Sequence, residues 1–127
     1  MKFSINENVI NTQFDFDTMT ISGDETKGFR PFQLLVSSLV GCSMLVYRRI
    51  LEKQKIEYDE MYVEADVERS DNQISKVEKV FIHFKIKGKD LNLTKLEKSL
   101  NIAKKNCSMV QSVINSIEVI ETVEVIK

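Results

Sequence analysis

The side chains best suited to covalent chemistry are two cysteines, Cys42 and Cys107. The thiolate is the reactive form of cysteine, so the surroundings of each sulfur decide its reactivity. Cys42 stands in an apolar stretch, where a free cysteine often packs as a small hydrophobic residue. Gly41 beside it weakens a helix and predicts a kink or a close approach of another backbone. Cys107 follows two lysines at the expected start of a helix, where unpaired N–H groups and cations favour the thiolate.

Other catalytic or metal-binding devices have little support in the sequence. The single histidine, His83, occupies a polar position in an expected strand, and nothing in the sequence brings it near either cysteine. We therefore expect His83 to be a surface residue. Two isolated cysteines and one histidine lack the close ligand pairs of zinc sites, so we expect no metal and no cofactor.

Length and charge narrow the class of protein. The chain has 127 residues, which predicts one domain spanning residues 1–127. Eighteen basic and nineteen acidic residues give a net charge of −1, which does not favour nucleic acid or an anionic membrane as a partner. The most apolar stretch, residues 34–47, is too short for a membrane span and fits a buried helix. Without a signal peptide at residues 1–10, we expect a cytoplasmic protein.

The apolar pattern predicts an α+β protein with the element order β-β-α-β-β-α-α-β. Alternation of apolar and polar residues predicts strands, and longer apolar periods predict helices. Thr94 looks like the first residue of a capping box that opens the second helix. The strands are expected in antiparallel pairs because the helices do not alternate with them one by one. The expected strands are residues 3–5, 14–21, 61–67, 80–86 and 117–126, and the expected helices are residues 32–54, 94–105 and 108–115.

Two segments that contain the cysteines resemble the signature motifs of the OsmC/Ohr family. In residues 28–42, Pro31 opens a helix of leucines and small residues, and Cys42 follows eleven residues after the proline. In residues 96–110, a helix is followed by Cys107 at the start of the next helix. Both motifs occur in the family's order, and the resemblance covers nearly the whole chain.

This resemblance implies an OsmC-like fold, in which antiparallel sheets and long central helices form an intertwined homodimer with active sites at the subunit interface. It also implies that Cys42 attacks a hydroperoxide and becomes a sulfenic acid. Cys107 would then form a disulfide with it, and a dithiol would reduce that disulfide.

The chain departs from the family pattern at the groups that activate the first cysteine. Phe32 stands where the peroxidases have Glu, and Gln33 stands where many relatives have it. No arginine precedes Arg30, which is the available substitute for the family's arginine. Without an Arg–Glu pair, we expect burial to raise the pKa of Cys42. The proline that usually follows the second cysteine is replaced by Ser108.

Two functions are therefore compatible with the sequence. The first is a thiol-dependent peroxidase for organic hydroperoxides, with Cys42 and Cys107 as catalytic residues. The second is a catalytically depleted relative that binds a small apolar or thiol-containing ligand at the dimer interface. The two cysteines favour the first function, whereas Phe32 and Gln33 favour the second. In either case an apolar pocket is expected from Phe32, Leu35 and Met44, with Arg30 and Gln33 as auxiliary residues.

Overall fold

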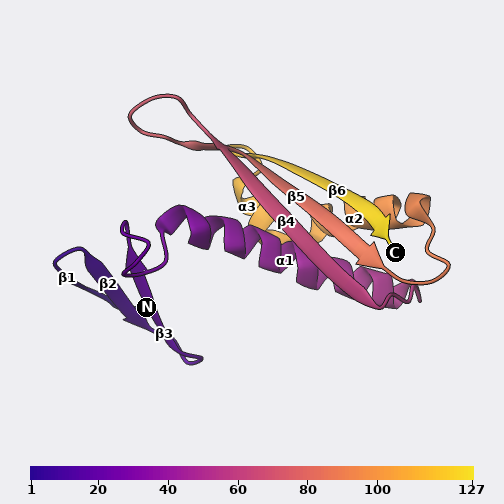
Figure 1. Cartoon of the computed structure of the whole chain (residues 1–127), viewed down its shortest axis with the longest axis horizontal. Helices are drawn as coiled ribbons and strands as arrows, with labels where there is room; N and C mark the ends of the chain where they lie inside the picture. The colour runs from indigo at the N-terminus through magenta and orange to yellow at the C-terminus, as the bar shows by residue number, and fades with distance from the viewer. The chain divides into compact units, whose positions relative to one another are not determined.

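The computed structural model describes all 127 residues and contains six strands and three helices. The chain divides into two compact units, Met1–Ser37 and Ser38–Lys127. The elements, labelled in Figure 1, are β1 (Phe3–Asn6), β2 (Val9–Gln13), β3 (Thr18–Ser22), α1 (Pro31–Lys53), β4 (Glu60–Arg69), β5 (Val77–Lys87), α2 (Leu93–Asn106), α3 (Ser108–Val113) and β6 (Glu118–Ile126).

The N-terminal unit contains an antiparallel sheet in the order β1-β2-β3. Residues 14–17 were expected to begin a strand, and this prediction is wrong because they form the turn between β2 and β3. In that turn the Phe14 N–H donates to the Asp17 carbonyl at 3.1 Å. Gly28 packs closely against β3, since a Cβ atom there would lie 2.9 Å from the Ser22 nitrogen.

Helix α1 begins at Pro31, which suits the first helical position because its missing N–H has no partner there. Its length and apolar composition would allow it to cross a membrane. Leu39, Tyr47 and Leu51 are nevertheless buried inside the protein. The helix is therefore the core helix of the fold, as the sequence predicts.

Gly41 does not have the role that its position suggests. Helix α1 continues through it, and an added Cβ atom would meet nothing within 4 Å. The expected kink or close backbone approach at the Cys42 thiol is therefore wrong within the single chain.

The C-terminal unit contains a mixed sheet in the order β4-β5-β6. β4 and β5 are antiparallel, as predicted, but β6 runs parallel to β5. The expectation of purely antiparallel sheets is therefore wrong. The physical reason is that α2 and α3 form a crossover between β5 and β6, which returns the chain in the same direction.

One face of this sheet forms the core together with α1 and α2 (Figure 1). The Tyr47 ring of α1 meets Phe84 of β5 edge-on, with ring centroids 5.0 Å apart. The Tyr47 hydroxyl donates to the Leu96 carbonyl of α2 at 2.8 Å. Tyr47 thereby ties α1 to both the sheet and α2. The side chains of β5 buried on this face are Val80, Ile82, Phe84 and Ile86.

Helix α2 begins earlier than expected. Asn92 is its N-cap, and the Asn92 side chain accepts a hydrogen bond from the Lys95 N–H at 3.1 Å. Thr94 lies inside the first turn, so the predicted capping box is wrong. Cys107 is the single residue between α2 and α3, and its extended backbone breaks the helix.

Candidate active site

The structure brings the two cysteines together, although they are far apart in the sequence. Cys42 lies half-buried on α1, and Cys107 is buried at the junction of α2 and α3. Their side chains are within hydrogen-bonding reach of each other. Both are free thiols. Proximity of the two side chains is one requirement of a disulfide-forming pair.

The start of α3 faces the Cys42 sulfur. The backbone N–H groups of Ser108 and Met109 donate to it. The Ser108 hydroxyl adds a contact at 3.8 Å. The unpaired N–H groups of a helix start stabilise negative charge, so this arrangement favours the Cys42 thiolate.

These contacts set the ionisation of Cys42. Burial raises the pKa of the thiol, but the hydrogen bonds from Cys107, Met109 and Ser108 outweigh this effect and hold the pKa below its ordinary value. The expectation of a raised pKa for Cys42 is therefore wrong. The amides of α3 supply hydrogen bonds to the sulfur, a source of stabilisation that does not depend on an Arg–Glu pair.

Cys107 shows the opposite behaviour. Burial and the hydrogen bond with Cys42 raise the pKa of Cys107, and the Val110 N–H and Ser43 offset this only in part. The expected thiolate at Cys107 is therefore wrong. Two N–H groups at the start of α3 are directed at Cys42, and the Lys104 ammonium donates to the Val119 carbonyl. The pair is thus polarised, with Cys42 as the more acidic thiol.

Two further residues in the cysteine site were not predicted from the sequence. Ser43 is buried beside Cys107, with its hydroxyl oxygen 3.7 Å from the Cys107 sulfur. The same hydroxyl lies 2.8 Å from the Glu121 carboxylate. Burial raises the pKa of Glu121, while the Ser43 hydrogen bond and Lys104 lower it in part. The sequence feature that could have indicated Glu121 is its position between Val119 and Val123, on the core-facing side of the strand.

Arg30 and Gln33 lie at the start of α1 in the N-terminal unit. The Gln33 side chain accepts a hydrogen bond from the Arg30 N–H at 3.1 Å, as the third residue of a capping box does. The Arg30 guanidinium lies over the Phe32 ring, 4.9 Å from its centroid. These contacts explain Gln33 as a helix-capping residue.

The remaining predicted pocket residues are distributed between the two units. Phe32 and Leu35 belong to the N-terminal unit and Met44 to the C-terminal unit, and each is half-buried.

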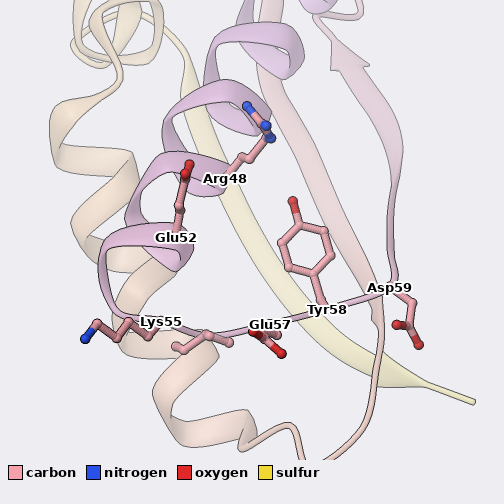
Figure 2. A pocket seen from close by; sticks show the side chains of 7 residues that line it. Arg48, Glu52, Lys55, Glu57, Tyr58 and Asp59 are labelled. Carbon is pink, nitrogen blue, oxygen red and sulfur yellow. The ribbon is translucent and has the colours of Figure 1, made fainter.

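A separate polar pocket of about 610 Å³ lies near the end of α1 and includes neither cysteine. In Figure 2 the Arg48 and Tyr58 side chains approach the same space from α1 and from the segment before β4. The lining mixes cations with carboxylates, including Glu52 and Asp59. No group of three or more His, Cys, Asp or Glu side chains is arranged to hold a metal ion.

Comparison with known proteins identifies the class. Residues 23–122 match the family model described as OsmC-like protein. Because this match covers most of the chain, the chain belongs to the OsmC-like family. No curated protein sequence matches it.

Solved structures support the same fold. A hypothetical protein from Aquifex aeolicus VF5 has a TM-score of 0.86 at 20% identity, with 98% of this chain and 93% of that chain covered. An OsmC-like protein from Mycoplasma pneumoniae has a TM-score of 0.86 at 16% identity, with 99% and 95% covered. The organic hydroperoxide resistance protein OhrB of Bacillus subtilis has a TM-score of 0.68 at 15% identity, with 98% of each chain covered.

Proposed function

We propose that this protein is a thiol-dependent peroxidase that reduces organic hydroperoxides with Cys42 and Cys107. The observation that supports this function best is the proximity of two free thiols, of which Cys42 is partly exposed and Cys107 is buried. The half-exposed Cys42 has a lowered pKa, and the buried Cys107 beside it has a raised pKa. A peroxidatic cysteine needs thiolate character and access to its substrate, whereas a resolving cysteine must stay protected until it is needed.

The proposed reaction proceeds in three steps. The Cys42 thiolate attacks the outer oxygen of the hydroperoxide, the O–O bond breaks, and the alkoxide takes a proton to leave as an alcohol. Cys107 then attacks the sulfur of the Cys42 sulfenic acid, and the S–O bond breaks with release of water. A dithiol reductant finally exchanges with the Cys42–Cys107 disulfide, restoring both thiols and becoming a disulfide itself.

Several parts of this proposal rest on the sequence. Phe32, Leu35 and Met44 are the proposed contacts for the organic group of the hydroperoxide, with Arg30 and Gln33 as auxiliary residues. We propose that the chain acts in the cytoplasm as one OsmC-like domain spanning residues 1–127, within a homodimer and without a cofactor.

The test is to treat the reduced protein with less than one equivalent of an organic hydroperoxide and analyse it by mass spectrometry. We expect a Cys42–Cys107 disulfide in the wild type. The Cys107→Ser variant should stop at the Cys42 sulfenic acid, and the Cys42→Ser variant should not consume hydroperoxide. If Cys42 stays a thiol through a large excess of several hydroperoxides, the peroxidase proposal fails. The alternative, a protein that binds an apolar or thiol-containing ligand, would then be favoured by the side chains at Phe32 and Gln33.

A further inference from the structure

A carboxylate on the core-facing side of β6 is connected to the cysteine pair. Glu121 lies opposite Ile82 of β5, between two valines of the same strand that are buried. The Glu121 Oε1 atom is 2.8 Å from the Ser43 hydroxyl oxygen, and Oε2 is buried without a hydrogen-bond partner. The same hydroxyl oxygen lies 3.7 Å from the Cys107 sulfur.

The single hydroxyl hydrogen of Ser43 determines which group donates to which in this arrangement. A serine hydroxyl has one hydrogen to donate and can accept at its oxygen. The Ser43 hydroxyl is placed to donate either to the Cys107 sulfur at 3.7 Å or to the Glu121 carboxylate at 2.8 Å. The carboxylate is the nearer and more strongly accepting neighbour, so the Ser43 hydrogen belongs to Glu121 when Glu121 is charged. While Cys42 is a thiolate, the single Cys107 hydrogen is donated to Cys42. Once Cys42 carries a leaving group it no longer accepts that hydrogen, and the Cys107 thiol can donate to the Ser43 oxygen instead. The groups form a continuous path from Cys107 through Ser43 to Glu121.

We propose that Glu121, acting through Ser43, receives the proton of Cys107 when Cys107 attacks the sulfur of Cys42. Glu121 does not touch the reacting sulfurs, so it is a positioning residue, and Ser43 is the group in contact with the thiol. The physiological setting of this step rests on the proposed peroxidase function, but the step itself occurs whenever Cys42 carries a leaving group.

The proton and electron balance of the step is complete. The Cys107 proton moves to the Ser43 oxygen while the Ser43 proton moves to Glu121. The sulfur electron pair of Cys107 forms the S–S bond, and the bond from Cys42 to its leaving group breaks. In the peroxidase cycle the leaving hydroxide takes a proton and becomes water. Glu121 also lines a pocket of about 370 Å³ between α2 and β6, through which its proton can return to solvent.

The surroundings of Glu121 suit a proton acceptor. Burial raises its pKa, which brings its basicity closer to that of the thiol that it serves. The charged and titratable groups around it are Tyr47 from α1 and Glu97 and Lys104 from α2. An inward-pointing charge on an edge strand can also serve only to prevent edge-to-edge aggregation. The experiment must distinguish these two roles.

The probe is 5,5′-dithiobis(2-nitrobenzoate) in excess over the reduced protein, followed by stopped-flow absorbance. Attack by Cys42 gives a first release of the coloured thiolate, with a rate that depends on the reagent concentration. Attack by Cys107 on the mixed disulfide gives a second release, and the rate of this release is independent of the reagent concentration. The leaving thiolate needs no proton. The pH dependence of the second phase therefore reports how the Cys107 thiol loses its proton.

We expect the second phase of the wild type to be independent of pH between the pKa values of Glu121 and Cys107. In Glu121→Gln this phase should become about tenfold slower for each unit by which the pH falls below the pKa of Cys107, because solvent must then remove the proton. Near neutral pH the loss should be about a hundredfold, the lower end of the usual range for a positioned base. The first phase should change little.

The matched control is Glu118→Gln, which removes an exposed carboxylate of the same strand, 3.8 Å from Lys79, and should behave as the wild type. The proposal is overturned if Glu121→Gln keeps the wild-type pH profile. It is also overturned, without any variant, if the wild-type second phase itself changes tenfold per pH unit throughout this range. Because the probe is a disulfide, a protein that fails to react with hydroperoxides still gives a decisive result.

Discussion

At Cys42 the backbone supplies contacts that a cationic side chain can also supply to a thiolate. Its thiol receives hydrogen bonds from two consecutive amides and from the Cys107 thiol. Backbone amides keep their positions with little entropy cost, because the helix that carries them is already formed. The ionisation of Cys42 is therefore sensitive to the residue at position 108, which supplies both an N–H and a hydroxyl.

Two substitutions at Ser108 separate these contributions. Ser108→Ala removes the hydroxyl and keeps the N–H, so we expect a small rise in the pKa of Cys42. Ser108→Pro removes both groups, so we expect a larger rise and a severalfold slower alkylation of Cys42 at neutral pH. Proline is tolerated at a first helical position, and the extended backbone of Cys107 suits a following proline. Rates of iodoacetamide alkylation against pH, read by mass spectrometry, provide the measurement. Equal alkylation profiles in the two variants would contradict the role of the amide.

Glu121 also predicts a pH dependence of stability. Burial raises its folded-state pKa above the ordinary value of 4.5, so the folded state binds more protons than the unfolded state in the interval between the two. Stability contributed by this group therefore falls as the pH rises through that interval. We expect Glu121→Gln to be more stable than the wild type near neutral pH, with the difference disappearing below about pH 4.5. Urea unfolding of both proteins from pH 4 to 8 measures this, and a difference that is constant with pH would contradict it.

The sequence identifies the two cysteines better than it predicts their ionisation. Both cysteines are identifiable from their motifs, but the direction of each pKa shift depends on which sulfur the α3 amides face. Composition around Cys42 indicates burial, and burial alone would raise its pKa. Glu121 is visible only as one carboxylate in an apolar row, and its hydrogen bond to Ser43 depends on the tertiary structure.

At the scale of elements, helix α1 and the β4–β5 hairpin are predicted well because their periodic patterns are long and uninterrupted. The direction of β6 is not predicted by the sequence, because an amphipathic strand has the same alternation of apolar and polar residues in parallel and antiparallel pairing. At the start of α2, two residues compete for the N-cap position. Asn92 and Thr94 are both acceptable N-cap residues, and the structure selects Asn92.

The choice of cap predicts a difference between two substitutions. Asn92→Ala removes the acceptor for the Lys95 N–H and should lower the free energy of unfolding by about 1 kcal/mol. Thr94→Ala, two residues later and exposed, should change it by less than about 0.5 kcal/mol. Urea unfolding followed by circular dichroism measures both values. A larger loss in the Thr94 variant would restore the capping box that the sequence indicated.

At the scale of the whole molecule, a small chain buries only part of the surface that its unfolded form exposes, so apolar side chains of a long helix can stay exposed in a monomer. Leu45 of helix α1 is a large apolar side chain that is 64% exposed in the single chain. Leu45 lies on α1 one turn after Gly41, where a Cβ atom would meet nothing. Both positions lie on a part of α1 that the proposed homodimer would cover.

The proposed homodimer predicts a particle of about 29 kDa in solution, twice the mass of the 14.7 kDa chain. Leu45→Asp places a charge on the exposed part of α1 and should shift the protein toward monomer, because an unpaired charge is costly to bury. Ile74→Asp is the matched control, since Ile74 lies in the loop between β4 and β5 and should not affect assembly. Light scattering coupled to size-exclusion chromatography measures all three proteins. A monodisperse wild-type monomer would exclude the dimer, and a dimer unaffected by Leu45→Asp would move the interface away from this face of α1.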